Sequence, residues 1–187
     1  MKNLVAVAWL VFLPTPHAAW AQLSNRTAQV ISFRVEHEPL PIDVRTLIKP
    51  LSAELMRVFK MTAVEPVAGL EVRWGNENPF NKFKKLSKQE LEYAQGANDN
   101  LRLKVEIEHR YNAVLGGLLK KSKRHVMRLK LALFASGNQR VWFQKKKASC
   151  CIDLGVDPED ESMHYSMDRD EFMTLYRTVI AKSLAKF

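Results

Sequence analysis

Two segments in the second half of the sequence alternate between apolar and polar side chains. Within residues 101–111, the odd positions up to Ile107 are apolar and the even positions are charged, and within residues 125–134 the odd positions from Met127 to Leu133 are apolar. A period of two residues is typical of a β-strand, and one apolar face with one polar face is typical of antiparallel sheets. We therefore predict two antiparallel strands here. In the first, the side chains expected to face the core are Leu101, Leu103, Val105 and Ile107, and those expected to face solvent are Arg102, Lys104, Glu106 and Glu108.

Shorter strand signals surround these two segments. Residues 30–36 predict a first strand with Ile31, Phe33 and Val35 on one face, and residues 70–74 predict a short second strand. Residues 136–138 (Ser-Gly-Asn) indicate a turn, after which residues 141–145 return as a hairpin partner.

Three helices are predicted from their starting signals and apolar stripes. Asp43 is placed to cap a helix whose apolar residues recur every four positions, from Leu47 to Phe59. Ser87 with Glu90, and Asp168 with Glu171, have the spacing of capping boxes, in which each side chain accepts a hydrogen bond from the other residue's backbone N–H. The order of elements is therefore β-α-β-α-β-β-β-α. This order predicts an α/β fold, an α+β two-layer sandwich whose later sheet is largely antiparallel.

The composition fits this expectation. The chain has 187 residues, of which 47% are hydrophobic and 26% charged, and these values exclude a disordered, collagen-like or multi-span membrane chain. No linker or repeat divides residues 22–187, so we expect one domain there. Two cysteines are too few for a disulfide framework or a cysteine-rich zinc module.

The first 21 residues resemble an export signal. Lys2 is followed by an apolar run of ten residues, two prolines and the small-residue pair Ala19 and Ala21. The run is shorter than the roughly 18 residues that a membrane span needs. We predict a signal peptide over 1–21, a periplasmic or secreted location, and no transmembrane span once the leader is removed.

Three short stretches carry a resemblance to a family. They are the first strand with its long helix, the sequence Gln95-Gly96-Ala97-Asn98 before a strand, and the hairpin over 132–142. Together they resemble the domain shared by the TolB amino-terminal region, the curli-secretion lipoproteins and related small bacterial envelope proteins. This sequence departs from that pattern at Asn98, where the family often has an acid, and it has no lipid-anchor cysteine after the leader. The resemblance implies an envelope location and no catalytic residue, because those proteins are generally not enzymes.

Catalytic motifs are absent from the sequence. It contains no Gly-x-Ser-x-Gly elbow, Gly-rich phosphate loop, His-Glu-x-x-His or Cys-x-x-Cys. We therefore expect a protein that is not an enzyme and has no cofactor or metal. His109 and His125 could lie near each other if their strands pair, and the simplest interpretation is two strand-end histidines at a sheet edge. His37 lies between two glutamates, but strand alternation would point it to the opposite face from them.

Cys150 and Cys151 are adjacent, and three interpretations stay open. They are two unbonded thiols on opposite faces of a strand, a strained vicinal disulfide that could act as a redox switch, and a disulfide to another chain.

Cations concentrate in the middle of the chain. Residues 82–147 hold 17 Lys and Arg against five carboxylates, whereas residues 153–171 hold eight carboxylates and one Arg. An excess of cations on one part of a protein favours an anionic partner. The apolar segment 114–119 lies beside one of the cationic clusters, in a stretch, 112–123, that we expect to be a long loop. Two interpretations stay open, which are contact of this loop with an anionic membrane surface and, as the simpler one, packing of its leucines back onto the sheet. The expected contacts are Lys120, Lys121, Lys123, Arg124, Lys145, Lys146 and Lys147.

These observations favour a non-catalytic exported binding or assembly module for an envelope protein or an anionic surface. Export removes the chain from the usual nucleic-acid targets, so we expect no nucleic-acid partner. Two alternatives remain, which are a thiol-based redox protein or enzyme that uses Cys150 or Cys151, and a structural subunit of a homo-oligomer.

Overall fold

A computed structural model of the chain describes residues 23–37, 39–75, 83–93, 100–115, 121–136, 138–152 and 167–185. The side chains of residues 93, 111–115, 121–124, 151 and 152 are not described. The predicted leader lies outside the described residues.

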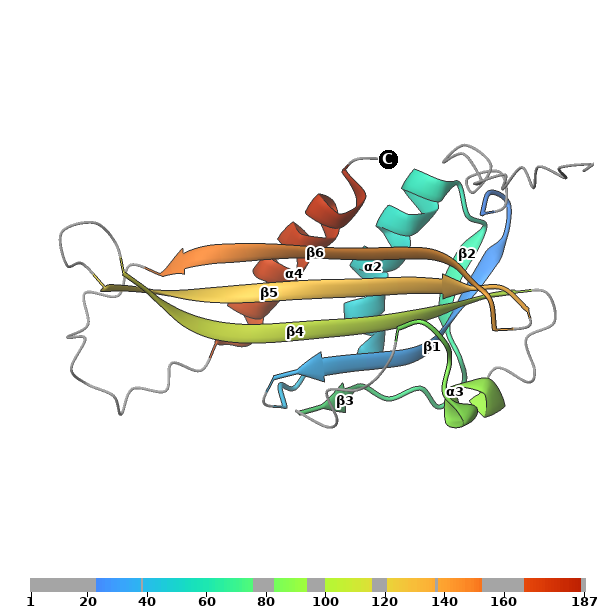
Figure 1. The fold of residues 1–187 in the computed structure, drawn as a ribbon, viewed down its shortest axis with the longest axis horizontal. Coiled ribbons are helices and arrows are strands. Elements are labelled where there is room, and N and C mark those ends of the chain that lie inside the picture. The colour runs from blue at the N-terminus through green and yellow to red at the C-terminus, as the bar shows by residue number, and fades with distance from the viewer. Residues whose placement is uncertain are drawn as a thin grey trace, which may run out of the picture.

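The described residues form one mixed sheet with helices packed against it (Figure 1), so the predicted α/β class is confirmed. The strand order is β2-β1-β4-β5-β6, and β3 pairs with β1. β1 is parallel to β2, β3 and β4, whereas β4, β5 and β6 form an antiparallel meander. The elements are β1 (Thr27–Glu36), α2 (Val44–Phe59), β2 (Ala63–Pro66), β3 (Arg73–Trp74), α3 (Lys88–Tyr93), β4 (Leu101–Leu115), β5 (Lys121–Phe134), β6 (Arg140–Ile152) and α4 (Arg169–Leu184).

Helices α2 and α4 cover one face of the sheet and form the main core with it (Figure 1). The apolar stripe of α2 packs there, and so do the odd-numbered residues 101–107 of β4 and 127–133 of β5. We call this the helix face of the sheet and the opposite side the outer face. The inward positions predicted from the alternation of β4 and β5 are therefore confirmed.

The helix starts predicted from side-chain spacing are also confirmed. Asp43 Oδ1 accepts a hydrogen bond from Arg45 N at 2.8 Å. Both partners of the second capping box bond reciprocally, with Glu171 N donating to Asp168 Oδ1 and Asp168 N donating to Glu171 Oε2. The Ser87 and Glu90 pair does the same at α3. These bonds join residues two or three positions apart, so the local sequence is sufficient to predict them.

The predicted face of β1 is wrong at one position. The pairing of β1 with β4 shifts between Val30 and Ser32, and the irregularity turns Ile31 to the outer face. Phe33 and Val35 remain in the main core. An extra residue in one strand reverses the side-chain alternation, which the sequence alone does not reveal.

Two other strand predictions need correction. Strand β2 was not predicted, because its four residues, ending in Pro66, are too few to show an alternation. It forms because Val64 is buried and pairs in parallel with β1, and Ser52 Oγ donates a hydrogen bond to Val64 O at 3.0 Å. The strand predicted over 70–74 is reduced to Arg73–Trp74.

The long loop predicted over 112–123 is mostly strand. β4 continues to Leu115 and β5 begins at Lys121, with Leu115 opposite Lys121 in the register. β6 likewise continues to Ile152, well past the predicted end at residue 145. Backbone pairing between neighbouring strands extends all three beyond the segments that alternate in sequence.

A second, smaller apolar cluster lies on the outer face, where α3 and the segment before it cover part of the sheet. Ile31, Phe83, Leu86, Ala132 and Phe134 form this cluster. Lys104, Glu106 and Glu108 were expected to face solvent, and they do lie opposite the main core, but they are buried. That expectation was wrong because a sequence period does not show whether another segment covers the polar face.

Candidate functional site

Charged side chains form rows across β4, β5 and β6 on the outer face. In an antiparallel sheet, register partners lie side by side on the same face, so each row is a line of neighbouring side chains. The two rows, from β4 to β6, are Glu108–Arg128–Lys147 and Glu106–Lys130–Lys145.

The carboxylates of these rows are paired with the cations of β5. Lys130 Nζ lies 2.5 Å from Glu106 Oε1 and also pairs with Glu108, and Arg128 Nη1 lies 2.5 Å from Glu108 Oε2. Burial alone would raise the pKa of Glu108, but the hydrogen bonds from Lys130 and Arg128 outweigh it and lower that pKa. Burial would lower the pKa of Lys130, and its bonds to the two glutamates raise it instead. The carboxylates of Glu106 and Glu108 are therefore both compensated by cations of the outer face.

The cations of β6 lie at the outer end of the same rows. Lys145 and Lys147 are exposed, as is Phe143, whose side chain is 38% accessible. The guanidinium of Arg140 lies 4.8 Å from the centre of the Phe143 ring. Since β6 ends the strand order, this cationic strip of Phe143, Lys145 and Lys147 lies on an edge strand of the described sheet.

Of the other predicted contacts, the structure describes the side chain of Lys146 alone. Lys146 is half-buried and alternates to the helix face, where its neighbour Gln144 donates a hydrogen bond from Nε2 to Ser183 O of α4 at 2.7 Å. The predicted cluster over 145–147 is therefore divided between two faces. Lys120 lies outside the described residues, and Lys121, Lys123 and Arg124 lie in β5 with side chains that are not described.

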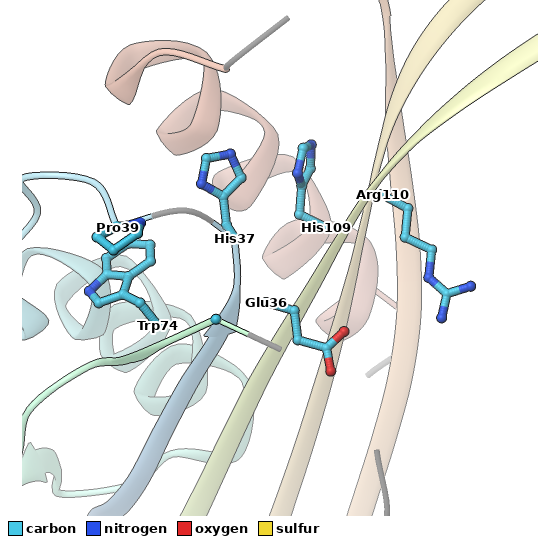
Figure 2. A pocket seen from close by; sticks show the side chains of 7 residues that line it. Glu36, His37, Pro39, Trp74, His109 and Arg110 are labelled. Atoms are coloured by element: carbon cyan, nitrogen blue, oxygen red, sulfur yellow. The ribbon is translucent and has the colours of Figure 1, made fainter. Parts of the chain in front are cut away.

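A pocket of about 490 Å³ opens where β1 ends beside β4 (Figure 2). Glu36 is paired with Glu108, and β4 continues past this pair while the β1 chain turns away at His37. Figure 2 shows the rings of His37 and His109 on the same side of the strands, whereas Glu36 and Arg110 point away from them. The lining residues are Glu36, His37, Pro39, Trp74, Gly75, His109 and Arg110.

Three histidine rings gather beside this pocket. His109 Nε2 and His125 Nδ1 are 2.8 Å apart and share a hydrogen bond, in which the protonated nitrogen is the donor. The two rings stack with their centroids 4.9 Å apart. The His37 ring centroid lies 4.8 Å from that of His109. Burial lowers the pKa of His109 to about 4, and electrostatic repulsion from His37 and His125 makes a smaller contribution to this shift. The pKa of the completely buried His125 is also lowered, mainly by burial.

The sequence predicted that His109 and His125 would lie close together if their strands paired. β4 and β5 do pair, and the two rings are in contact. Their expected position at strand ends was wrong, because β4 continues to Leu115 and β5 begins at Lys121. His125 is paired on both sides, whereas the pairing of β4 with β1 ends at Glu108, one residue before His109. The prediction that His37 points away from Glu36 is confirmed. Glu38 lies outside the described residues.

Cys150 lies opposite His125 in the register of β5 and β6, half-buried against the main core. The side chain of Cys151 is not described, so the three interpretations of this pair stay predictions.

The carboxylates of Glu36, Glu106 and Glu108 lie within 4.8 Å of one another and could in principle offer oxygen ligands to a cation. Burial, then the charges of Glu108 and Glu106, raise the pKa of Glu36. Lys130 and Arg128 already compensate the other two acids. This cluster is therefore an ion-pair network rather than an open metal site.

Among the described residues, no helix combines the length and apolar character needed to cross a membrane.

No family model matches the sequence, and no curated protein is significantly similar to it. Several solved structures have a similar arrangement. A minor lipoprotein from Acinetobacter baumannii is 13% identical with a TM-score of 0.41, and the match covers 88% of both chains. A hypothetical protein from Chlamydia trachomatis is 12% identical with a TM-score of 0.44, over 87% of this chain and 95% of that one. A homolog of neuraminyllactose-binding hemagglutinin from Helicobacter pylori is 10% identical with a TM-score of 0.41, over 87% and 83% of the two chains.

At these identities and scores the matches assign neither a family nor an activity. The resemblance to the TolB amino-terminal domain and the curli-secretion lipoproteins, and the export of the chain, stay predictions.

Proposed function

We propose that this chain is an exported, non-catalytic binding module that holds an anionic partner against the outer face of its sheet, at strands β5 and β6. The observation that carries this proposal is the cationic strip on β6. Lys145 and Lys147 are exposed side by side, while the nearest carboxylates of the same rows, Glu106 and Glu108, are engaged by Lys130 and Arg128.

The spacing of the strip suits a surface that carries repeated negative charges. Alternate residues of a strand lie roughly 7 Å apart on one face, so Lys145 and Lys147 can each contact a separate charged group. Phe143 adds an exposed aromatic ring two residues earlier on the same face. Anionic lipid headgroups beside an apolar boundary match both features.

Co-sedimentation with vesicles tests the proposal. We expect binding to vesicles that contain phosphatidylglycerol, no binding to pure phosphatidylcholine, and a loss of binding as the salt concentration rises, because ions screen exposed charges over about 8–10 Å. Lys145→Gln with Lys147→Gln should weaken the binding about 25-fold. Each lysine near an anionic surface contributes about 1 kcal/mol, which is roughly fivefold in affinity.

Lys49→Gln with Lys182→Gln is the matched control. It removes the same charge from exposed positions on α2 and α4, the helices that pack on the other face of the sheet. Equal losses in the two double variants would show an effect of net charge alone and would contradict a site on β6.

A further inference from the structure

Three histidines from distant parts of the sequence meet on the helix face at one end of the sheet. The parallel register of β1 and β4 pairs Glu36 with Glu108, so the next residues, His37 and His109, come side by side. The antiparallel register of β4 and β5 pairs His125 with Tyr111, two residues past His109. His125 is therefore the diagonal neighbour of His109, and His109 lies in contact distance of both other rings.

The distance between His37 and His109 suits a shared metal ion. Nitrogen–metal bonds of about 2.0–2.1 Å in tetrahedral geometry place the centroids of two ligating imidazoles roughly 5 Å apart. The observed centroids are 4.8 Å apart, with the ring planes inclined by 54°. Both rings line the pocket, and Figure 2 shows them side by side, so they can approach one ion without a change in the strands.

His125 is placed to orient His109. It is completely buried, and its Nδ1 lies 2.8 Å from His109 Nε2. With Nε2 engaged in that hydrogen bond, Nδ1 is the nitrogen that His109 can offer to a metal. Metal-ligating histidines usually have their second ring nitrogen held in this way, because the bond fixes the ring and its tautomer.

We propose that His37 and His109 bind a divalent transition-metal ion of the zinc class at this pocket, with His125 as the positioning residue behind His109. Imidazole nitrogen is a preferred ligand of Zn²⁺, Ni²⁺ and Cu²⁺. The pocket of about 490 Å³ leaves room for water or another ligand at the remaining coordination positions.

Zinc titration of untagged, chelator-treated protein by isothermal calorimetry tests this site. We expect one equivalent of Zn²⁺ to bind. His37→Ala and His109→Gln should each lower the affinity at least tenfold, and His125→Asn should lower it about 10–100-fold through the position of His109. Lys145→Gln with Lys147→Gln should bind zinc as the wild type does, since those residues lie on the outer face.

Circular dichroism and thermal melting of each variant separate loss of a ligand from loss of the fold. His37 lies in a bend just after β1 and is only half-buried, so His37→Ala decides the question if the variants at the more buried histidines unfold. The absence of zinc binding to the wild type, or wild-type affinity in folded His37→Ala, would overturn the proposal.

Substitution of Co²⁺ for Zn²⁺ reports the ligand types directly. Two imidazoles and water give visible d–d bands without a sulfur signal. A thiolate-to-cobalt charge-transfer band that disappears in Cys150→Ser would place Cys150 in the ligand set and overturn the two-histidine assignment.

Discussion

Lys104 Nζ and Glu90 Oε1 form an ion pair 2.6 Å long, although the residues are only 1% and 2% accessible. Lys104 lies near the start of β4 and Glu90 belongs to α3, so the pair fastens the short helix to the outer face of the sheet. The ammonium of Lys104 also lies 5.3 Å from the centre of the Phe83 ring.

Breaking this ion pair should strongly destabilise the fold. Glu90→Ala leaves the Lys104 ammonium buried without its carboxylate, and the loss of one partner of a buried pair costs about 3–5 kcal/mol. Urea unfolding of the two proteins measures the difference. Glu54→Ala is the control, because it breaks the exposed pair with Arg57 and should cost less than about 1 kcal/mol. Equal costs at the two sites would contradict the burial of Lys104 and Glu90.

The stability that Glu90 contributes should depend on pH in the acid range. Burial alone would raise the pKa of Glu90, but hydrogen bonds from Lys104 and from the Ser87 backbone outweigh it and hold the pKa below its ordinary value of 4.5. The folded protein therefore keeps Glu90 ionised at pH values where the unfolded chain binds a proton. This contribution is complete above pH 4.5 and is lost as the pH falls through the lower, folded-state pKa.

Unfolding free energies of the wild type and of Glu90→Gln across this range measure that contribution. The difference between the two proteins should be largest near neutral pH and should shrink as the solution is acidified. A difference that stays constant with pH would mean that the ionisation of Glu90 does not contribute.

Cys150 and Cys151 should not be bonded to each other. Both belong to β6 and keep consecutive register partners, His125 and Arg124. Consecutive side chains of a strand point to opposite faces, whereas a disulfide needs Cβ atoms about 3.5–4.5 Å apart. Alkylation of the denatured, unreduced protein should therefore label both thiols, as mass spectrometry would show. An unlabelled monomer lighter by two hydrogens would reveal a vicinal disulfide, and a dimer on a non-reducing gel would reveal a bond between chains.

Features that depend on neighbouring residues could be predicted from the sequence. The capping boxes at Ser87 and Asp168 form as expected, because each joins side chains and backbone three residues apart. The inward faces of β4 and β5 were likewise predictable, since alternation along one strand specifies which side chains share a face.

The candidate sites could be predicted only in part. His109 and His125 were expected to meet if their strands paired, but the approach of His37 depends on the parallel register of β1 and β4, which joins distant segments. The run Lys145–Lys147 is continuous in sequence, yet strand geometry divides it between two faces because β6 extends further than its own residues indicate.

The sequence by itself determined the apolar faces, the helix starts and the concentration of cations around the hairpins, because these depend on local spacing and composition. The tertiary structure decided which polar residues are buried. Glu106 and Glu108 alternate as solvent-facing residues would, and only the pairing of β4 with β5 places them beside Lys130 and Arg128. Burial and ion pairing depend on which distant segments cover a face, and the period of a single strand carries no information about that cover.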